Sequence, residues 1–236
     1  MLSKMVESFY NYMPFNIGID NNTNIPWPSL CSHLDSAESF TELGCGTGWL
    51  CSRVKNKYPN IAVTGIDISE TAINESKLKS NKINWKLQDL TEYDKKSDVV
   101  VSIGVLHHIP DYSIYELMCK TINMANNYTF IGLYHTHSRK AMFDFFNRYS
   151  ENKQKKLFKK MTPHMESKQR ESWFRDQFNN PFEQTTTLDV YKQVAKDTNT
   201  KLTFTSISTD SIYESTMLAL ETFEFKSGFI YGGFEK

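Results

Sequence analysis

The stretch Thr41–Leu50, which reads TELGCGTGWL, has the residue types and spacing of a ligand-binding turn. Gly44, Gly46 and Gly48 follow an apolar strand-like run, and Trp49 begins a helix-like run. A tight glycine turn between a strand and a helix lets the backbone approach a nucleotide-type ligand closely. The spacing is not that of the dinucleotide fingerprint, and the absence of a following Lys-Ser/Thr pair excludes a phosphate-binding P-loop. The turn therefore predicts a nucleotide-type ligand without identifying it.

Acidic residues end the next two strand-like runs. Asp67 ends the strand in VTGIDIS, and Asp89 ends the strand in INWKLQDL with Gln88 beside it. Ligands of open parallel sheets bind at the carboxyl ends of the strands, so both acids are expected at one site. Each acid alone could instead cap the turn or helix that follows it. Their order behind the glycine turn favours ligand binding.

Histidines cluster after the fourth and fifth strand-like runs, as His107, His108, His135 and His137. Histidine has an ordinary pKa suited to removing a proton from a hydroxyl or a protonated amine. We expect His108 to contact the ligand bound at the glycine turn, and His135, beside Tyr134, to face the second reactant. The alternative for His107 or His108 is to cap backbone groups in the following turn.

The segment from Arg139 to Arg175 is strongly basic, with eleven Lys and Arg against four acids. It could admit an anionic small substrate or contact RNA through its interleaved aromatic residues. We favour solvated helix faces whose aromatic residues pack inward. The motif WFRDQ could line a pocket for a substrate, or it could fasten this segment to the core, and both interpretations remain open. Its polar and aromatic members are Trp173, Arg175, Asp176 and Gln177.

Strands and helices must alternate to position these groups. Strands are predicted at Phe40–Leu43, Ile61–Ile66, Ile83–Leu87, Val99–Ile103 and Tyr128–Leu133. Helices are predicted at Trp49–Tyr58, Glu70–Ser80 and Tyr112–Asn126, the last with an apolar stripe of Ile114, Leu117, Met118 and Ile122. Turns are expected at Asn81-Lys82, Pro110-Asp111 and Asn126-Asn127. This alternation is typical of an α/β fold with a parallel sheet covered on both faces.

One domain is expected over residues 1–236. An N-terminal arm over 1–38, a helix followed by a loop at NNTNIPWP, would cross the ligand edge of the sheet. Residues 39–135 would form the ligand-binding core and 136–185 an inserted helical cap. Residues 186–236 would supply the last helix and a pair of strands, Lys201–Ser208 and Ser227–Phe234.

Bulk composition narrows the choice of partner. Lys and Arg number 27 and so do Asp and Glu, so no overall field attracts nucleic acid or anionic membrane. No segment has the apolar length of a membrane span, and the first residues lack the apolar run of a signal peptide. Four cysteines form no CxxC pair, and no acidic cluster suggests Mg²⁺. We expect a cytoplasmic protein with free thiols and no metal.

Together these motifs resemble the class I S-adenosylmethionine-dependent methyltransferases, whose first motif is similar to Glu42-Leu43-Gly44-Cys45-Gly46-Thr47-Gly48. In that family an acid ending the second strand binds both ribose hydroxyls, which matches Asp67, and a polar group ending the third strand faces the adenine amine, which matches Asp89. The run DVVVSIGVLHHIPD resembles the fourth motif. The resemblance implies a Rossmann-like fold, with a seven-stranded, mainly parallel sheet, and a cofactor group of Glu42, Gly44, Cys45, Gly46, Gly48, Asp67, Ile68, Gln88, Asp89, Leu90 and Gly104.

The predicted function is transfer of a methyl group from S-adenosylmethionine to a small-molecule acceptor, leaving S-adenosylhomocysteine. Candidate catalytic residues are His135, His108 and Tyr134. Candidate acceptor-binding residues are Trp173, Arg175, Asp176, Gln177 and His137. Two alternatives remain: an RNA methyltransferase that uses the basic cap, and a non-catalytic protein that binds S-adenosylmethionine. Whether the acceptor atom is oxygen, nitrogen or carbon, and whether the protein is an oligomer, stays open.

Overall fold

Seven strands form the central sheet of the computed structural model, which describes residues 2–14, 27–206, 212–224 and 228–236. The strand order is β3-β2-β1-β4-β5-β7-β6. Neighbours pair in parallel except at β7, which is antiparallel to both β5 and β6. The strands are β1 Ser39–Leu43, β2 Ala62–Asp67, β3 Asn84–Leu87, β4 Ser97–Ile103, β5 Ala125–Tyr134, β6 Lys201–Thr205 and β7 Phe229–Glu235. The prediction of a seven-stranded, mainly parallel sheet is confirmed.

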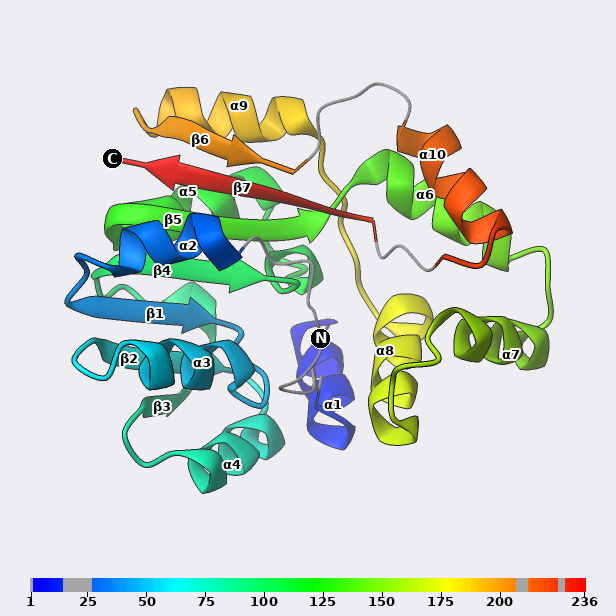
Figure 1. The fold of residues 1–236 in the computed structure, drawn as a ribbon, viewed down its shortest axis with the longest axis horizontal. Coiled ribbons are helices and arrows are strands. Elements are labelled where there is room, and N and C mark those ends of the chain that lie inside the picture. The colour runs from blue at the N-terminus through cyan, green and yellow to red at the C-terminus, as the bar shows by residue number, and fades with distance from the viewer. Residues whose placement is uncertain (1, 15–26, 207–211, 225–227) are drawn as a thin grey trace.

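Helices cover both faces of the sheet (Figure 1). Residues of α2 and α3 join the apolar cluster on one face, and residues of α5 and α9 join the cluster on the other. The helices are α1 Leu2–Tyr12, α2 Trp27–Leu34, α3 Trp49–Lys57, α4 Glu70–Lys79, α5 Ile114–Met124, α6 Thr136–Phe146, α7 Glu151–Met161, α8 Ser167–Asn179, α9 Leu188–Asp197 and α10 Ile212–Glu221, with short 3₁₀ turns η1 Leu90–Glu92 and η2 Leu106–His108.

The β-branched run of β4 shows why these strands lack the alternation of a half-exposed sheet. Val99 and Val101 join the cluster under α2 and α3, whereas Val100 joins the cluster under α5 and α9. Successive side chains point to opposite faces, so a strand covered on both faces needs apolar residues at every position. The predicted stripe of α5 is buried against the second cluster.

One predicted turn, Asn126-Asn127, is wrong. Ala125 is the C-cap residue after α5 and also the first residue of β5, so both asparagines lie inside the strand. The backbone of Ala125 is already extended, with φ −84° and ψ 143°. The chain changes from helix to strand at one residue, and the polar pair occupies the exposed start of β5.

Helices α6, α7 and α8 lie beyond the carboxyl ends of β1, β4 and β5 (Figure 1). They share an apolar cluster with Leu220 of α10, whose members include Phe146, Phe158 and Phe174. Helix α10, which lies between β6 and β7 in the chain and was not among the predicted helices, packs on α6. The loop expected at 21–28 falls mostly outside the described residues. We call α6, α7, α8 and α10 the cap.

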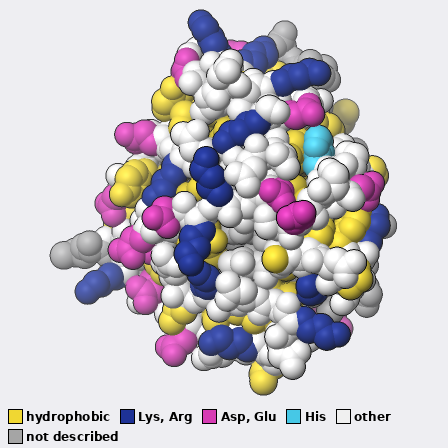
Figure 2. All heavy atoms as spheres, turned by 90° about the vertical axis from the view of Figure 1, so that its left-hand side faces the viewer, with side chains coloured by type: hydrophobic (Ala, Val, Ile, Leu, Met, Phe, Trp, Pro, Cys, Tyr) yellow, Lys and Arg dark blue, Asp and Glu magenta, His cyan; other side chains and the backbone are white. Residues whose placement is uncertain are grey.

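The opposite end of the sheet carries a mixed surface. Figure 2 shows Lys and Arg side chains interspersed with Asp and Glu on this face, in keeping with the zero net charge. Within the part of the chain that the structure describes, no helix has the length and apolar character needed to cross a membrane.

Candidate functional site

A cavity of about 430 Å³ lies at the carboxyl ends of the parallel strands. Its walls come from the strand ends and the turns after them, from α1, from α7 and α8, and from β7. This volume lies in the range of small-molecule sites. The chain therefore builds one cavity from segments that are distant in sequence.

The glycine turn forms one wall of this cavity. Gly44 has φ +73°, and a Cβ atom there would lie 2.2 Å from the Val105 side chain, so only glycine fits. The Gly46 backbone N–H donates to Asp67 Oδ2 over 2.7 Å. This bond ties the turn after β1 to the end of β2.

Asp67 retains hydrogen-bonding capacity toward the cavity. Its Oδ2 accepts from Gly46, and its Oδ1 accepts from the backbone N–H of Ser69 over 2.8 Å. The backbone N–H of Ile68 also stabilises this carboxylate, so three backbone donors face its four lone-pair positions and acceptor capacity remains for a ligand. Burial raises the pKa of Asp67, while the backbone N–H donors oppose that shift. The remaining acceptor capacity suits a ligand hydroxyl such as that of a ribose.

Asp89 combines the two roles considered from the sequence. Its Oδ1 accepts from both the backbone N–H and the hydroxyl of Thr91, each over 2.8 Å, and so caps η1. Asp89 also lines the cavity. The capping interpretation is therefore correct for one oxygen of Asp89, and the other oxygen remains to meet a ligand.

Glu42 is the most deeply buried acid of this group, at 8 % exposure. Its Oε2 accepts from the backbone N–H and the thiol of Cys51, over 3.1 and 3.0 Å. Burial raises the pKa of Glu42 to about 8 despite these two donors. The free protein therefore holds this carboxyl largely protonated at neutral pH, and a cationic ligand would favour its ionised form.

The predicted cofactor group lines the cavity with one exception. The residues brought together are Glu42, Gly44, Cys45, Gly46, Asp67, Ile68, Gln88, Asp89, Leu90 and Gly104. Gly48 is not among them, and we no longer assign it to the site. It precedes α3 with φ +77°, and a Cβ there would lie 2.4 Å from the Trp85 ring. Gly48 is thus required for packing. Glu42, Asp67 and Asp89 with the glycine turn are called the sheet side.

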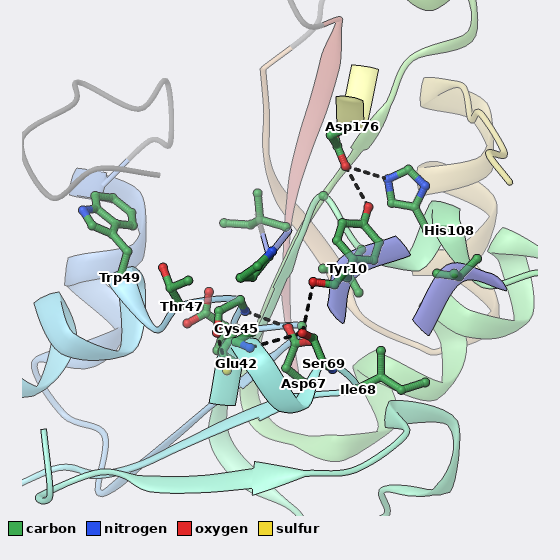
Figure 3. Close-up of a pocket in the computed structure, with 18 of the residues that line it drawn as sticks. Tyr10, Glu42, Cys45, Thr47, Trp49, Asp67, Ile68, Ser69, His108 and Asp176 are labelled. Carbon is green, nitrogen blue, oxygen red and sulfur yellow. Dashed lines mark hydrogen bonds and ion pairs between the residues drawn. The ribbon is translucent and has the colours of Figure 1, made fainter. Parts of the chain in front are cut away.

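Asp176 of α8 is the centre of a second group of polar residues. Its Oδ1 accepts from the Tyr10 hydroxyl over 2.7 Å, and its Oδ2 accepts from the Tyr134 hydroxyl over 2.9 Å. The amide of Gln177 donates to the same Oδ2 over 3.2 Å. Figure 3 shows Asp176, Tyr10 and His108 grouped together, apart from Glu42, Cys45 and Asp67. Tyr10, His108, Tyr134, Asp176 and Gln177 are called the cap side.

Both tyrosines of the cap side are hydrogen-bond donors. Burial first, and then the negative charge of Asp176, raises the pKa of Tyr10 and of Tyr134 well above the ordinary value. Each hydroxyl therefore stays protonated and donates a hydrogen bond to Asp176. Tyr134, predicted as a catalytic residue, is on this geometry a residue that positions Asp176.

Arg139 of α6 orients the cap side from behind. Its Nη1 donates to Gln177 Oε1 over 2.7 Å, so the Gln177 nitrogen must face Tyr134 and Asp176. Its Nε donates to Glu183 over 2.6 Å, and its guanidinium lies 4.0 Å from the Tyr134 ring centre. Arg139 is 1 % exposed and is neutralised by Glu183. The sequence alone identifies Arg139 only as one of the basic residues of the segment from Arg139 to Arg175.

The two histidines of η2 differ. His108 lines the cavity, whereas His107 is fully buried between Tyr134 and His108 and does not reach it. Burial lowers the pKa of His107 well below the ordinary value, so its ring is neutral. The Nδ1 of His108 is 2.9 Å from the Phe182 carbonyl oxygen, which fixes the hydrogen of the neutral ring on Nδ1. Its Nε2 is on the side of Asp176, whose Oδ1 lies 3.7 Å away.

Three further predicted residues lie outside the cavity, and we withdraw their assignments. His135 directly follows Tyr134 at the end of β5, so it points to the opposite side, and the exposed His137 lies beside it. Arg175 precedes Asp176 on α8 and is therefore rotated by about 100° around the helix axis. Its guanidinium lies 4.2 Å from the Phe9 ring centre, where it holds α1 in place.

Several cavity residues were not predicted from the sequence. Tyr10 comes from α1, and Met161, Thr162, His164 and Met165 come from the end of α7 and the segment after it. Trp173, Asp176 and Gln177, which were predicted, also line the cavity. The aromatic run FYNYMPF in an arm expected at the ligand edge was the available signal for Tyr10.

The family comparison agrees with this geometry. Residues 41–117, from β1 into α5, match the family model described as "Methyltransferase domain". The fold is that of structurally characterised class I methyltransferases, with the cavity at the carboxyl edge of the sheet. Residues 41–117 therefore match a methyltransferase domain, and the whole chain has the Rossmann-like fold of these enzymes, as the sequence-based resemblance predicted.

Individual relatives are more distant. The chain is 27 % identical over 122 residues to a probable (S)-tetrahydroprotoberberine N-methyltransferase 2 of Papaver bracteatum, covering 49 % of this chain and 33 % of that one. It is 36 % identical over 75 residues to malonyl-[acyl-carrier protein] O-methyltransferase 2 of Ilyobacter polytropus, covering 29 % of each. The matches thus span a third or less of these relatives.

A solved structure, that of magnesium protoporphyrin IX methyltransferase from Synechocystis PCC 6803 with bound SAH, is similar over the whole chain. The TM-score is 0.57 at 14 % identity, and the match covers 100 % of this chain and 87 % of that one. This likeness establishes the fold and leaves the acceptor of the present protein undefined.

Proposed function

We propose that this protein transfers a methyl group from S-adenosylmethionine to a small-molecule acceptor. The observation that carries the proposal is the sheet side, where Glu42, Asp67 and Asp89 line one cavity beside a glycine turn. Their carboxyl oxygens match a ligand rich in donors and cationic groups, which S-adenosylmethionine is. When bound there, S-adenosylmethionine supplies an electrophilic methyl group on a sulfonium.

The residues of the chain would then bind the cofactor and orient the acceptor toward it. Asp67 offers its remaining acceptor capacity to the ribose hydroxyls, and Asp89 offers an oxygen to the adenine amine. The backbone at Gly46 and Gly104 lets the cofactor lie against the sheet edge. Alignment of an acceptor behind the methyl group can provide much of the rate enhancement.

The cap side supplies the proton chemistry of the proposal. His108 has a buried Nε2 without a hydrogen-bond partner among the described residues, and this nitrogen can accept a proton from the acceptor. The walls from α1, α7 and α8 cover the reacting groups and reduce access of water. We propose that residues 136–185 act as a cap on a single domain and that the protein works in the cytoplasm.

The cap aromatics favour a small acceptor over RNA. Phe145, Phe146, Phe158 and Phe174 are at most 5 % exposed and pack into the cap cluster. Base stacking needs exposed rings, so the lysines of α7 have no such aromatic partners from this group. RNA binding that weakens steeply with salt would revive the alternative, because phosphate contacts release counterions.

Calorimetry with S-adenosylmethionine and S-adenosylhomocysteine tests the proposal. We expect binding to the wild type and a loss of affinity of about a hundredfold or more in Asp67→Ala, because two charge-assisted hydrogen bonds are removed. Asp189→Ala on the exposed surface of α9 is the matched control. Absence of binding to the wild type would contradict the proposal. Binding without turnover of a labelled methyl donor would favour the non-catalytic alternative.

A further inference from the structure

The cavity is lined by acidic side chains on both its sheet side and its cap side. Its lining includes four acids, Glu42, Asp67, Asp89 and Asp176, and no Lys or Arg among the described residues. Three of these acids belong to the sheet side and match the proposed cofactor. Asp176 belongs to the cap side and stands next to the space left for the acceptor.

Asp176 is held by neutral donors. Tyr10, Tyr134 and Gln177 satisfy three of its four lone-pair positions without bringing a positive charge. Arg139 lies behind Gln177 and is neutralised by Glu183. The carboxylate is 6 % exposed, so its charge is screened little by water. This arrangement leaves a buried negative charge available to a cation in the cavity.

His108 completes the arrangement. Its Nε2 lies 3.7 Å from Asp176 Oδ1 and has no hydrogen-bond partner among the described residues. That distance is too long for a direct hydrogen bond in either protonation state of the ring. An atom between the two, about 2.9 Å from each, could donate one hydrogen to Nε2 and one to Oδ1.

An amine fits this position better than a hydroxyl. An ammonium or primary amine nitrogen carries at least two hydrogens and can donate to both atoms, whereas a hydroxyl carries one. Only the ammonium also brings the positive charge that Asp176 lacks. The cavity lining also includes apolar and aromatic side chains, namely Val6, Pro14, Met161, Met165, Trp173 and Phe229. They suit a hydrophobic body behind the amine.

We propose that the methyl acceptor is an amine on an apolar or aromatic body, bound by Asp176 and deprotonated by His108. This inference rests on the proposed methyl transfer. The amine enters as an ammonium and loses one proton to His108 Nε2, which passes it to solvent. The nitrogen lone pair forms the new N–C bond while the electron pair of the S–C bond remains on sulfur. The second proton leaves through His108, whose charged ring is balanced by Asp176.

The same geometry disfavours anionic acceptors. A carboxylate placed at the cap side would face Asp176 without a Lys or Arg on the described cavity wall. The basic residues that the sequence suggested as an entry for anionic substrates therefore do not extend into the site. The acceptor is selected by the single charge of Asp176.

Two probes with one carbon skeleton test the inference: 2-phenylethylamine and 2-phenylethanol. Each is titrated by calorimetry into protein saturated with S-adenosylhomocysteine, so that failure of the cofactor to bind would be detected first and separately. We expect the amine to bind about tenfold or more tightly than the alcohol, as one charge-assisted hydrogen bond implies. Equal affinity, preference for the alcohol, or no saturable binding of either probe would overturn the inference.

A variant locates the preference. Asp176→Asn keeps the shape and removes the charge, and it is expected to lose the preference for the amine. Asp144→Asn, at a half-buried position of α6 that does not line the cavity, is expected to retain it. Circular dichroism checks the fold of each variant. If Asp176→Asn does not fold, a small-molecule extract with deuterium-labelled methyl donor decides the matter in the wild type. Label on nitrogen supports the inference, and label only on oxygen or carbon, or no labelled product, contradicts it.

Discussion

The sheet side and the cap side of the cavity are built in different ways. The sheet side takes its residues from one stretch, 42–89, and its acids are held mainly by backbone N–H groups and short turns. The cap side joins residues far apart, such as Tyr10 and Asp176, through bonds between side chains. Substitutions on the sheet side should therefore act locally, whereas those on the cap side should act through their neighbours.

Removing Arg139 should have the largest effect, because it supports only the cap side. Arg139→Met leaves Glu183 without its buried partner and should lower the free energy of unfolding by about 3–5 kcal/mol. Urea unfolding measures the change. Lys140→Met, at a neighbouring exposed ion pair with Asp144, is the control and should change stability by less than about 0.5 kcal/mol. Similar losses of stability in both variants would contradict the special role of Arg139 in supporting the cap side.

Glu42 should make the stability of the sheet side depend on pH. Its folded pKa of about 8 exceeds the ordinary value of 4.5, so the native state binds the proton more tightly. The stabilisation is fully present below pH 4.5 and is lost as the pH rises through about 8. In the free protein the loss is about 3 kcal/mol by pH 7 and about 5 kcal/mol once the pH is well above 8. The free energy of unfolding, measured at several pH values across this range, should depend less steeply on pH in Glu42→Gln than in the wild type. An equal pH dependence in the two proteins would contradict the assignment.

Substitution of His108, which lines the cavity, should affect turnover far more than substitution of His135, which lies outside it. His108→Asn removes the proposed base and should lower kcat by about a hundredfold, with cofactor affinity retained. His135→Ala should leave kcat within about twofold, since its ring lies outside the cavity. Turnover measured with labelled methyl donor and a methylated amine distinguishes them. A larger loss in His135→Ala would restore the original sequence-based choice.

Tyr10 should show the smallest effect and the clearest link between α1 and the cap side. Tyr10→Phe removes one donor to Asp176 and should lower kcat/KM by about fivefold, as one hydrogen bond of about 1 kcal/mol implies. Tyr12→Phe, at an exposed position of the same helix, is the control. Cofactor affinity should be unchanged in both variants, and a loss in Tyr10→Phe would connect the two sides more closely than proposed.

Most of the sheet was predictable, because its strands are apolar runs and turn residues separate most of them. The boundaries that failed were those without a turn, as at Ala125, where a helix becomes a strand within one residue. The packing of α10 on α6 could not be predicted, because an apolar helical stripe does not specify which surface it will cover.

The sequence by itself determined the class of protein and the sheet side. Residues at the ends of consecutive parallel strands meet at one edge, so Glu42, Asp67 and Asp89 could be placed together by counting along the chain. Only the tertiary structure decided the cap side. Tyr134 faces the cavity and His135 does not because one residue reverses direction along a strand, and Asp176 meets Tyr10 only after α1 and α8 pack across the same opening.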